Sequence, residues 1–314
     1  MILLGEHAVG YGEPAIATPI GLRLTLTTTL NDRTLKDGGP STRPTDPSVR
    51  TAVDTAATLF ALAPHQVTTE VESGIPPGCG LGSSAAFTVA LLRTLADLTD
   101  RHPGQDELLD QARAVEAAFH GTSSGLDDAA VGLGATIWFQ RTPRPHAAPL
   151  PVREAFDLVI AITRERRSTA RQVDLLRRRA QLHPDLFRRH FTHLGGLTRV
   201  GRDALGTGDL AALGRLLDEA QGVLAGMGLS TPALDHAIAT ARSAGALGAK
   251  LTGAGGGGAV IALVPGGASA VVADALRSDG HETFVSRVAA TGPRADRPPL
   301  QDVSATAGCG PRGA

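Results

Sequence analysis

Alternating apolar and polar positions predict two strands in the first half of the chain. Within residues 21–30, Leu22, Leu24 and Leu26 fall on one side and polar residues fall on the other. This period of two is typical of a half-buried strand. Residues 67–72 repeat the alternation. The wider apolar spacing of helices predicts helical segments at residues 49–62, 85–98 and 106–119.

The second half continues the mixture of strands and helices. The predicted elements are strands at 135–140, 157–163, 259–264 and 282–288, and helices across 168–245 and at 268–277. One helix start is explicit, because Ser230 and Thr231 place capping residues directly before Pro232. Strands and helices alternate in both halves, so the pattern predicts a mixed α/β or α+β protein.

Chain length and turn-forming residues divide the chain into parts. Its 314 residues are roughly two domains' worth. The proline-rich run 141–153 is the expected linker, which gives domains at 1–150 and 151–290. Residues 31–48 are rich in Gly, Pro, Asp and Thr and predict a loop. We expect residues 291–314 to form a disordered tail.

Composition excludes several classes of protein. The net charge of −1 gives no basic excess, so we expect neither a nucleic-acid partner nor an anionic membrane surface. The chain has no signal-peptide pattern and no apolar run near the roughly 18 residues of a membrane span. Its two cysteines, Cys79 and Cys309, are too few for a disulfide framework. These features predict a cytoplasmic protein.

Lysine occurs only at Lys36 and Lys250, which limits lysine chemistry to two candidates.

The segment PPGCGLGSSA at residues 76–85 is the strongest chemical signal. It lies between a predicted strand and a long predicted helix. Glycines let backbone approach an anion closely, and the positive end of the helix dipole favours phosphate. Ser83 and Ser84 stand at the helix start, where hydroxyls can contact phosphate or a metal ion. The spacing matches neither a Walker loop nor a dinucleotide-binding motif. The alternative is an ordinary turn capped by serine.

Three acidic residues follow further along the chain. Glu116 lies near the end of a predicted helix, and Asp127 and Asp128 follow the turn HGTSSGL. Phosphoryl transfer needs Mg²⁺ to neutralise phosphate charge and a carboxylate to orient or deprotonate the attacking hydroxyl. One acid could serve each task. Acids are also common at helix ends and turns, so on their own these residues are better explained as a solvated helix end.

Two further segments resemble parts of a binding site. KLTGAGGGGA, residues 250–259, contains four successive glycines before an apolar strand. Glycines cost backbone entropy, so we expect close packing against a ligand or another segment rather than a flexible linker. GEHAVGYGEPAIA, residues 5–17, places Glu6 and His7 directly after an apolar strand. Strand ends often carry functional residues, although a surface turn would look the same.

Together the four segments resemble the ordered motifs of the GHMP kinases and, within that family, those of mevalonate kinases. The resemblance rests on GEHAVGYGEPAIA, PPGCGLGSSA, HGTSSGLDDA and KLTGAGGGG, and on the helical segment 208–235. It covers residues 1 to about 290. It implies a two-domain fold, with an N-terminal half of the ribosomal protein S5 domain 2 type. The C-terminal half would be ferredoxin-like with extra helices, and the active site would lie between the halves.

The resemblance also implies ATP- and Mg²⁺-dependent phosphorylation of the C5 hydroxyl of mevalonate. Asp127 would be the catalytic carboxylate. Ser84 and Glu116 would bind Mg²⁺. Mevalonate would contact Glu6, His7, Gly253 and Ala254. The ATP phosphates would be held by Pro77, Gly78, Gly80, Leu81, Gly82, Ser83 and Ser84.

The chain departs from the family in its lysines. Members of the family carry a lysine just before the strand that ends in Gly-Glu-His, where it is thought to pair with the catalytic aspartate. Neither Lys36 nor Lys250 matches that position. We therefore expect the reading frame to extend upstream of Met1 and to encode a lysine there. The alternatives are a weakened activity or an arginine in the lysine's role, with a different donor geometry.

Three other departures are local. Asp128 stands where asparagine is usual and adds a negative charge near the expected phosphates. Ser123 replaces a common proline. Arg164, Arg166 and Arg167 occupy a segment where many bacterial relatives have Asp-Thr-Gly. These arginines are interpreted as a solvated face, with contact to phosphate as the alternative.

Other functions stay open at this point. A GHMP kinase for phosphomevalonate or homoserine would carry similar motifs. A non-catalytic homologue that binds a ligand would have lost Asp127 or Glu116, and both acids are present. A related decarboxylase fits Glu6, His7 and the glycine-rich motif less well. The expected partner is a small molecule, mevalonate, and the resemblance also allows a homodimer.

Overall fold

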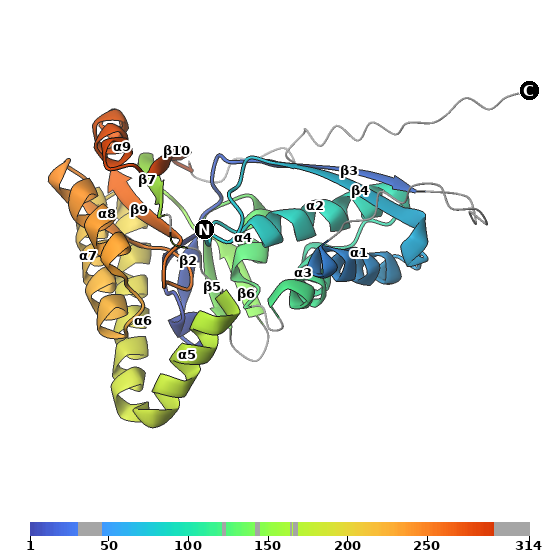
Figure 1. Ribbon diagram of the computed structural model, residues 1–314, viewed down its shortest axis with the longest axis horizontal. Coiled ribbons are helices and arrows are strands. Elements are labelled where there is room, and N and C mark those ends of the chain that lie inside the picture. The colour runs from blue at the N-terminus through green and yellow to red at the C-terminus, as the bar shows by residue number, and fades with distance from the viewer. Residues whose placement is uncertain (31–45, 121–123, 142–144, 164, 166–168, 292–314) are drawn as a thin grey trace, which may run out of the picture.

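A computed structural model describes residues 1–30, 46–120, 124–141, 145–163, 165 and 169–291. Figure 1 shows two lobes that meet near the N-terminus. Three sheets organise the described residues. The first sheet has the order β1 (Ile2–Leu4), β2 (Ala15–Ala17), β5 (Ile137–Arg141), β6 (Pro145–Pro149). The second pairs β3 (Leu24–Leu30) with β4 (Val67–Ser73). The third has the order β10 (Glu282–Val288), β7 (Phe156–Ile162), β9 (Ala259–Val264), β8 (Gly248–Leu251), and each pairing is antiparallel.

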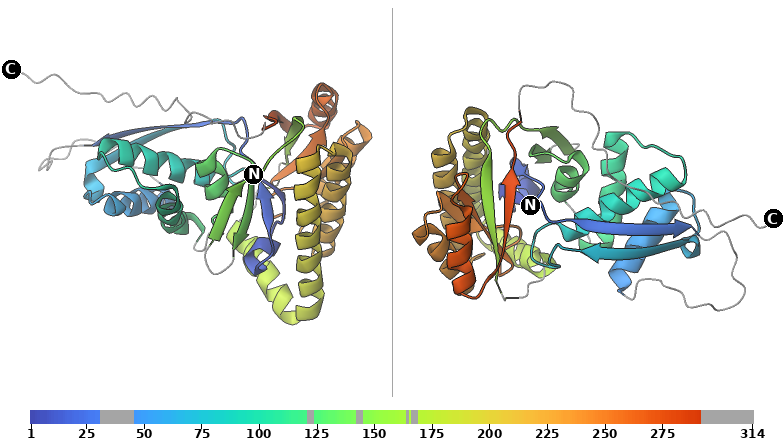
Figure 2. Two further views of the ribbon diagram at one scale, coloured as in Figure 1. Left: turned by 180° about the vertical axis from the view of Figure 1, so that it is seen from behind. Right: turned by 90° about the horizontal axis from the view of Figure 1, so that it is seen from above.

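The first lobe combines a long two-stranded ribbon with four helices. β3 (Leu24–Leu30) and β4 (Val67–Ser73) form the ribbon, in the register that pairs Leu24 with Ser73. The ribbon lies along the helices, as both views in Figure 2 show. The helices are α1 (Pro47–Leu59), α2 (Ser83–Leu98), α3 (Gln105–His120) and α4 (Leu126–Leu133), and η2 (Pro64–Gln66) is a short 3-10 turn.

The sheet between the lobes contains the start of the chain. Its strands are β1 (Ile2–Leu4), β2 (Ala15–Ala17), β5 (Ile137–Arg141) and β6 (Pro145–Pro149), with the 3-10 turn η1 (Ala8–Tyr11) between β1 and β2. Part of the proline-rich run expected to be a linker is therefore strand β6. A proline cannot donate to a neighbouring strand, but β6 lies at the sheet edge, where one side needs no such bond.

The second lobe is a four-stranded sheet covered by helices. Its central strand β7 (Phe156–Ile162) is buried at every position, which suits a strand covered on both faces. Ile160 pairs with Phe284 on one side and with Ile261 on the other. The remaining strands are β8 (Gly248–Leu251), β9 (Ala259–Val264) and β10 (Glu282–Val288). The helices are α5 (Thr169–Leu182), α6 (Pro184–Thr207), α7 (Leu210–Gly226), α8 (Pro232–Ser243) and α9 (Ser269–Ser278).

Helix starts follow the local sequence. The Thr231 side chain accepts a hydrogen bond from the Leu234 amide and Pro232 occupies the first helical position, so the predicted start of α8 is confirmed. Asp46 caps α1 in the same way, accepting from the Ser48 and Val49 amides.

One apolar core joins the start of the chain to the second lobe. Leu3 and Leu4 of β1 belong to the same buried cluster as β7, β9 and helices α6 and α7. Gly201 of α6 permits this packing, because a Cβ there would collide with the Leu4 side chain. The residues after β1 are thereby held close to the second lobe.

Several predicted features lie outside the described residues. These are most of the expected loop at 31–48, nearly all of the expected tail at 291–314, and the individual residues Ser123, Arg164, Arg166 and Arg167. Thr291, at the start of the tail, exchanges hydrogen bonds with the backbone of Val152. Among the described helices, none is both long and apolar enough to cross a membrane.

Candidate active site

The glycine-rich segment after β4 leads into the N-terminus of α2. Gly78, Gly80 and Gly82 all adopt positive φ, at 72°, 80° and 77°, a conformation that glycine adopts without strain. Gly82 is the N-cap residue, and the first turn of α2 has no side-chain cap. The backbone amides of such a turn and the helix dipole favour a bound anion. All predicted phosphate-binding residues, Pro77 to Ser84, lie in this segment and first turn.

Ser84 and Glu116 lie in contact, as expected for two ligands of one cation. Ser84 Oγ donates to Glu116 Oε2 at 3.2 Å, and Thr88 Oγ1, which was not predicted, donates to Oε1 at 3.1 Å. Glu116 is only 4% exposed. Burial raises its pKa from 4.5 to about 7, although both hydrogen bonds oppose the shift, and the charge of Asp127 raises the pKa further.

This donor set fits Mg²⁺. Carboxylate and hydroxyl oxygens are hard ligands, and Mg²⁺ commonly takes one or two protein carboxylates together with substrate phosphates. A cation beside Glu116 would also compensate the desolvated charge. Among the described residues, no cluster of three or more His, Cys, Asp or Glu side chains forms a metal site of the all-protein kind.

Asp127 lies beside the phosphate-binding segment. It is the second residue of α4, and a Cβ built on Gly82 would be 3.7 Å from the Asp127 Cγ atom. Asp127 Oδ1 is 3.3 Å from the Met1 nitrogen, and the side chain remains 37% exposed. The adjacent Asp128 is buried instead.

Arg93 of α2 donates to the Gly132 carbonyl at 2.6 Å, which ties the end of α4 to the helix that begins at the phosphate-binding segment.

Three contacts join β1 and the turn that follows it to β8 and the glycine-rich motif that follows β8. Lys250 Nζ forms an ion pair with Glu6 Oε1. Thr252 Oγ1 donates to the Ile2 carbonyl at 2.9 Å. His7 Nε2 lies 3.0 Å from the Ala254 carbonyl oxygen. We call this set of contacts the seam. It brings together the predicted substrate residues Glu6, His7 and Ala254.

The central pair of the seam is fully buried. Lys250 and Glu6 are each 0% exposed. Burial raises the pKa of the Glu6 carboxyl, and the Lys250 charge opposes that shift. Burial lowers the pKa of the Lys250 ammonium, and Glu6 opposes that shift in turn. The Asp127 charge also raises the Glu6 pKa, so the two carboxylates lie near one another.

The glycines after Lys250 are required by close packing. Gly253 has φ of 80°. Gly255 has φ of 73°, and a Cβ there would lie 2.5 Å from the Leu229 carbonyl oxygen. The prediction that these glycines pack tightly, rather than forming a flexible linker, is confirmed at this position.

Lys250 and Thr252 are absent from the predicted site residues. A sequence signal for Lys250 exists, because it lies within a strand whose neighbours are Gly, Ala and Leu. A charged residue in a buried strand is rarely tolerated without a partner. The partner itself is 244 residues away, so local spacing could not identify it.

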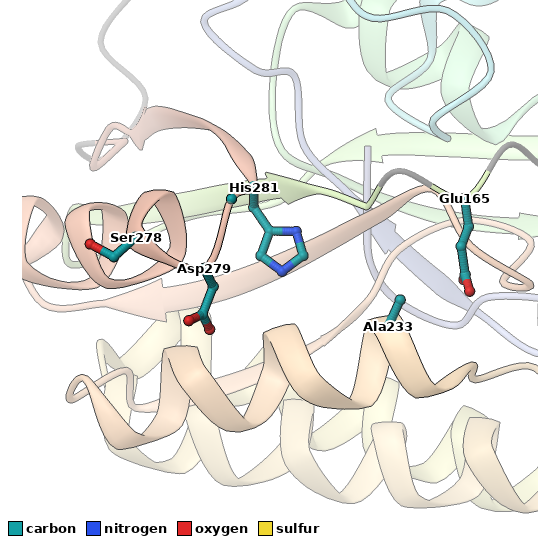
Figure 3. Close-up of a pocket in the computed structure, with 6 residues that line it drawn as sticks. Glu165, Ala233, Ser278, Asp279 and His281 are labelled. Carbon is teal, nitrogen blue, oxygen red and sulfur yellow. The ribbon is translucent and has the colours of Figure 1, made fainter.

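A separate pocket opens on the second lobe, between α8 and the turn from α9 to β10. It is lined by Glu165, Ala233, Ser278, Asp279, Gly280 and His281 (Figure 3). Its two carboxylates already accept hydrogen bonds, Glu165 from Thr231 and Asp279 from Thr240, each at 2.5 Å. None of the predicted site residues lines it.

Comparisons with known proteins identify the family of the chain. Residues 49–135 match the GHMP kinases N terminal domain, and residues 202–282 match the GHMP kinases C terminal domain. A mevalonate kinase of Pyrococcus abyssi is 31% identical and covers 94% of this chain and 95% of its own length. A mevalonate kinase of Methanothermobacter thermautotrophicus is 37% identical, over 84% of this chain and 88% of its own.

Solved structures of the family have the same fold. The L. major mevalonate kinase in complex with R-mevalonate superimposes with a TM-score of 0.80 at 25% identity, covering 93% of this chain and 94% of its own. The Methanococcus jannaschii mevalonate kinase gives 0.74 at 22% identity, over 92% and 95%. The predicted two-domain fold is thereby confirmed. The chain belongs to the GHMP kinase family and, within it, to the mevalonate kinases.

Proposed function

We propose that the chain transfers the terminal phosphoryl group of ATP to the C5 hydroxyl of mevalonate. The observation that carries this proposal is the arrangement of Asp127. Its carboxylate lies beside Gly82 at the start of α2 and near both Glu116 and Glu6. A hydroxyl placed next to Asp127 would therefore face phosphates held at the helix start.

Each group has a distinct task in this reaction. The first turn of α2 binds the phosphates through its amides and dipole. Ser84 and Glu116 hold Mg²⁺, which supplies charge neutralisation at the phosphates when it is bound. Asp127 orients the attacking hydroxyl and accepts its proton. Glu6, His7 and the backbone at Gly253 and Ala254 bind the alcohol.

The experiment is an ADP-release assay with mevalonate, phosphomevalonate and homoserine as separate acceptors. We expect mevalonate to give the highest kcat/KM, and Asp127→Asn to lower kcat by about 10²- to 10⁴-fold, the usual range for a positioned proton acceptor. Asp274→Asn is the matched control, because Asp274 is 71% exposed in an ion pair with Arg277 on α9. A higher kcat/KM for another acceptor, or full activity in Asp127→Asn, would contradict the assignment.

A further inference from the structure

The ion pair between Lys250 and Glu6 is costly as a purely structural device. Both side chains are removed from water. Among the described residues, Lys250 Nζ has one other hydrogen bond, of 2.7 Å, to the Leu251 carbonyl oxygen. Replacing a buried ion pair by apolar side chains of similar size is often neutral or stabilising. Stability therefore gives no sufficient reason for a charged pair at this place in the fold.

The pair holds Glu6 in one orientation. Lys250 binds Oε1, whereas Oε2 is buried and accepts no hydrogen bond from any residue that the structure describes. Buried polar atoms normally have a partner. The charged groups that act on Glu6 are Lys250, from β8, and Asp127, from α4. Lys250 thus fixes one oxygen of the Glu6 carboxylate, and the second oxygen has no hydrogen-bond partner among the described residues.

The residue after Glu6 is held in an unfavourable conformation. His7 has φ of 59° and ψ of −44°, a region that side chains other than glycine rarely occupy. Such strain persists when the surroundings fix the residue on several sides. The fixing contacts include the Glu6–Lys250 pair on one side and the Ala254 carbonyl oxygen, 3.0 Å from His7 Nε2, on the other.

We propose that Lys250 is a positioning residue for the alcohol-binding pocket. By pairing with Glu6 it fixes the Glu6–His7 turn against the glycine-rich motif, and so it sets the affinity for the alcohol rather than for ATP. This inference rests on the proposed function, since it assigns Glu6 and His7 to the alcohol. Among the described residues, Lys250 forms no hydrogen bond or ion pair with the N-terminus of α2 or with Glu116. Its effect on substrate binding therefore passes through Glu6.

The test is Lys250→Met, which keeps the length of the side chain and removes its charge. We expect the KM for mevalonate to rise about 10- to 100-fold, as for displaced positioning groups, with the KM for ATP changed by less than about 2-fold. The matched control is Arg242→Met. Arg242 pairs at 3.1 Å with Asp218, which accepts a hydrogen bond from the Ala249 amide, next to Lys250 on the same strand. Arg242→Met should leave the KM for mevalonate and the KM for ATP unchanged.

A second variant separates positioning from stability. Glu6→Gln combined with Lys250→Met contains no unpaired buried charge, so its Tm should recover relative to Lys250→Met alone. The double variant is compared with Glu6→Gln alone. If Lys250 acts through Glu6, adding Lys250→Met to Glu6→Gln should raise the KM for mevalonate by less than Lys250→Met does in the wild type, because the ion pair is already broken. This variant also supplies the measurement if Lys250→Met does not fold.

Three results would overturn the inference. They are an unchanged KM for mevalonate in both variants, a KM that returns to the wild-type value together with the Tm, and equal increases in KM for mevalonate and ATP. Failure of the proposed function looks different, because the wild-type chain itself would then prefer another alcohol. In that case the same comparison is made with the preferred alcohol.

Discussion

Replacing Glu116 with glutamine removes a buried negative charge while keeping the size of the side chain. Burial raises the pKa of Glu116 from 4.5 to about 7. Between these values the folded protein binds more protons than the unfolded chain, so the free energy of unfolding falls as pH rises and levels off above pH 7. One pKa unit corresponds to about 1.4 kcal/mol, so the ionised carboxylate costs about 3 kcal/mol at pH 8.

Glutamine removes this cost but loses a hydrogen bond. Glu116 accepts from both Ser84 and Thr88, whereas an amide has only one oxygen, and the lost bond costs about 1 kcal/mol. In the absence of Mg²⁺, we therefore expect Glu116→Gln to be more stable than the wild type by about 2 kcal/mol at pH 8. At pH 5 the wild-type carboxyl is protonated in the folded state, and the advantage should disappear.

Urea unfolding at pH 5 and pH 8, without Mg²⁺, measures both differences. Glu107→Gln is the matched control, because it makes the same change on an exposed residue of the same helix, α3. It should show no difference between the two pH values. ATP turnover by Glu116→Gln should fall by about 100-fold or more, as when a group that stabilises transition-state charge is removed. A stability difference that is the same at pH 5 and pH 8 would refute the reasoning from burial.

Two further predictions concern the scaffold. Gly248→Ala should destabilise the fold by more than about 3 kcal/mol, because its Cβ would lie 2.5 Å from the Gly214 carbonyl carbon where α7 packs on β8. Gly222→Ala, on the same helix with open space around its Cβ, should instead stabilise it by up to about 1 kcal/mol; urea unfolding of both variants checks the pair, and equal effects would contradict it. Thr231→Ala should cost about 1 kcal/mol through loss of the α8 cap to Leu234, measured by the same method.

The elements that the sequence predicts well are those determined by neighbouring residues. The strand predicted at residues 282–288 matches β10 in both bounds, and the Ser-Thr-Pro signal predicts the start of α8. The proline-rich run was misleading because prolines also occur at a sheet edge, and edge position depends on the whole strand order. Nothing near residues 145–149 reports that order.

The site residues can also be separated into those that the sequence predicts and those that depend on distant parts of the fold. Motif resemblance identifies Ser84 and Glu116, and the structure brings them into contact. Thr88 lies one turn further along α2 and supports the same carboxylate, so helical spacing from Ser84 could have suggested it. Lys250 differs, because its role depends on Glu6, and the distance between them along the chain carries no periodic signal.

The seam also has a consequence for the order in which the protein is made. Glu6 leaves the ribosome early, but Lys250 follows 244 residues later. At about 5 to 20 residues per second, that interval is on the order of 10 to 50 seconds. During this interval the Glu6 carboxylate lacks Lys250, its partner in the folded protein, and His7 lacks the Ala254 carbonyl oxygen that it contacts there. The proposed alcohol-binding site is therefore among the last parts to assemble, and a chain that stops before β8 would never complete it.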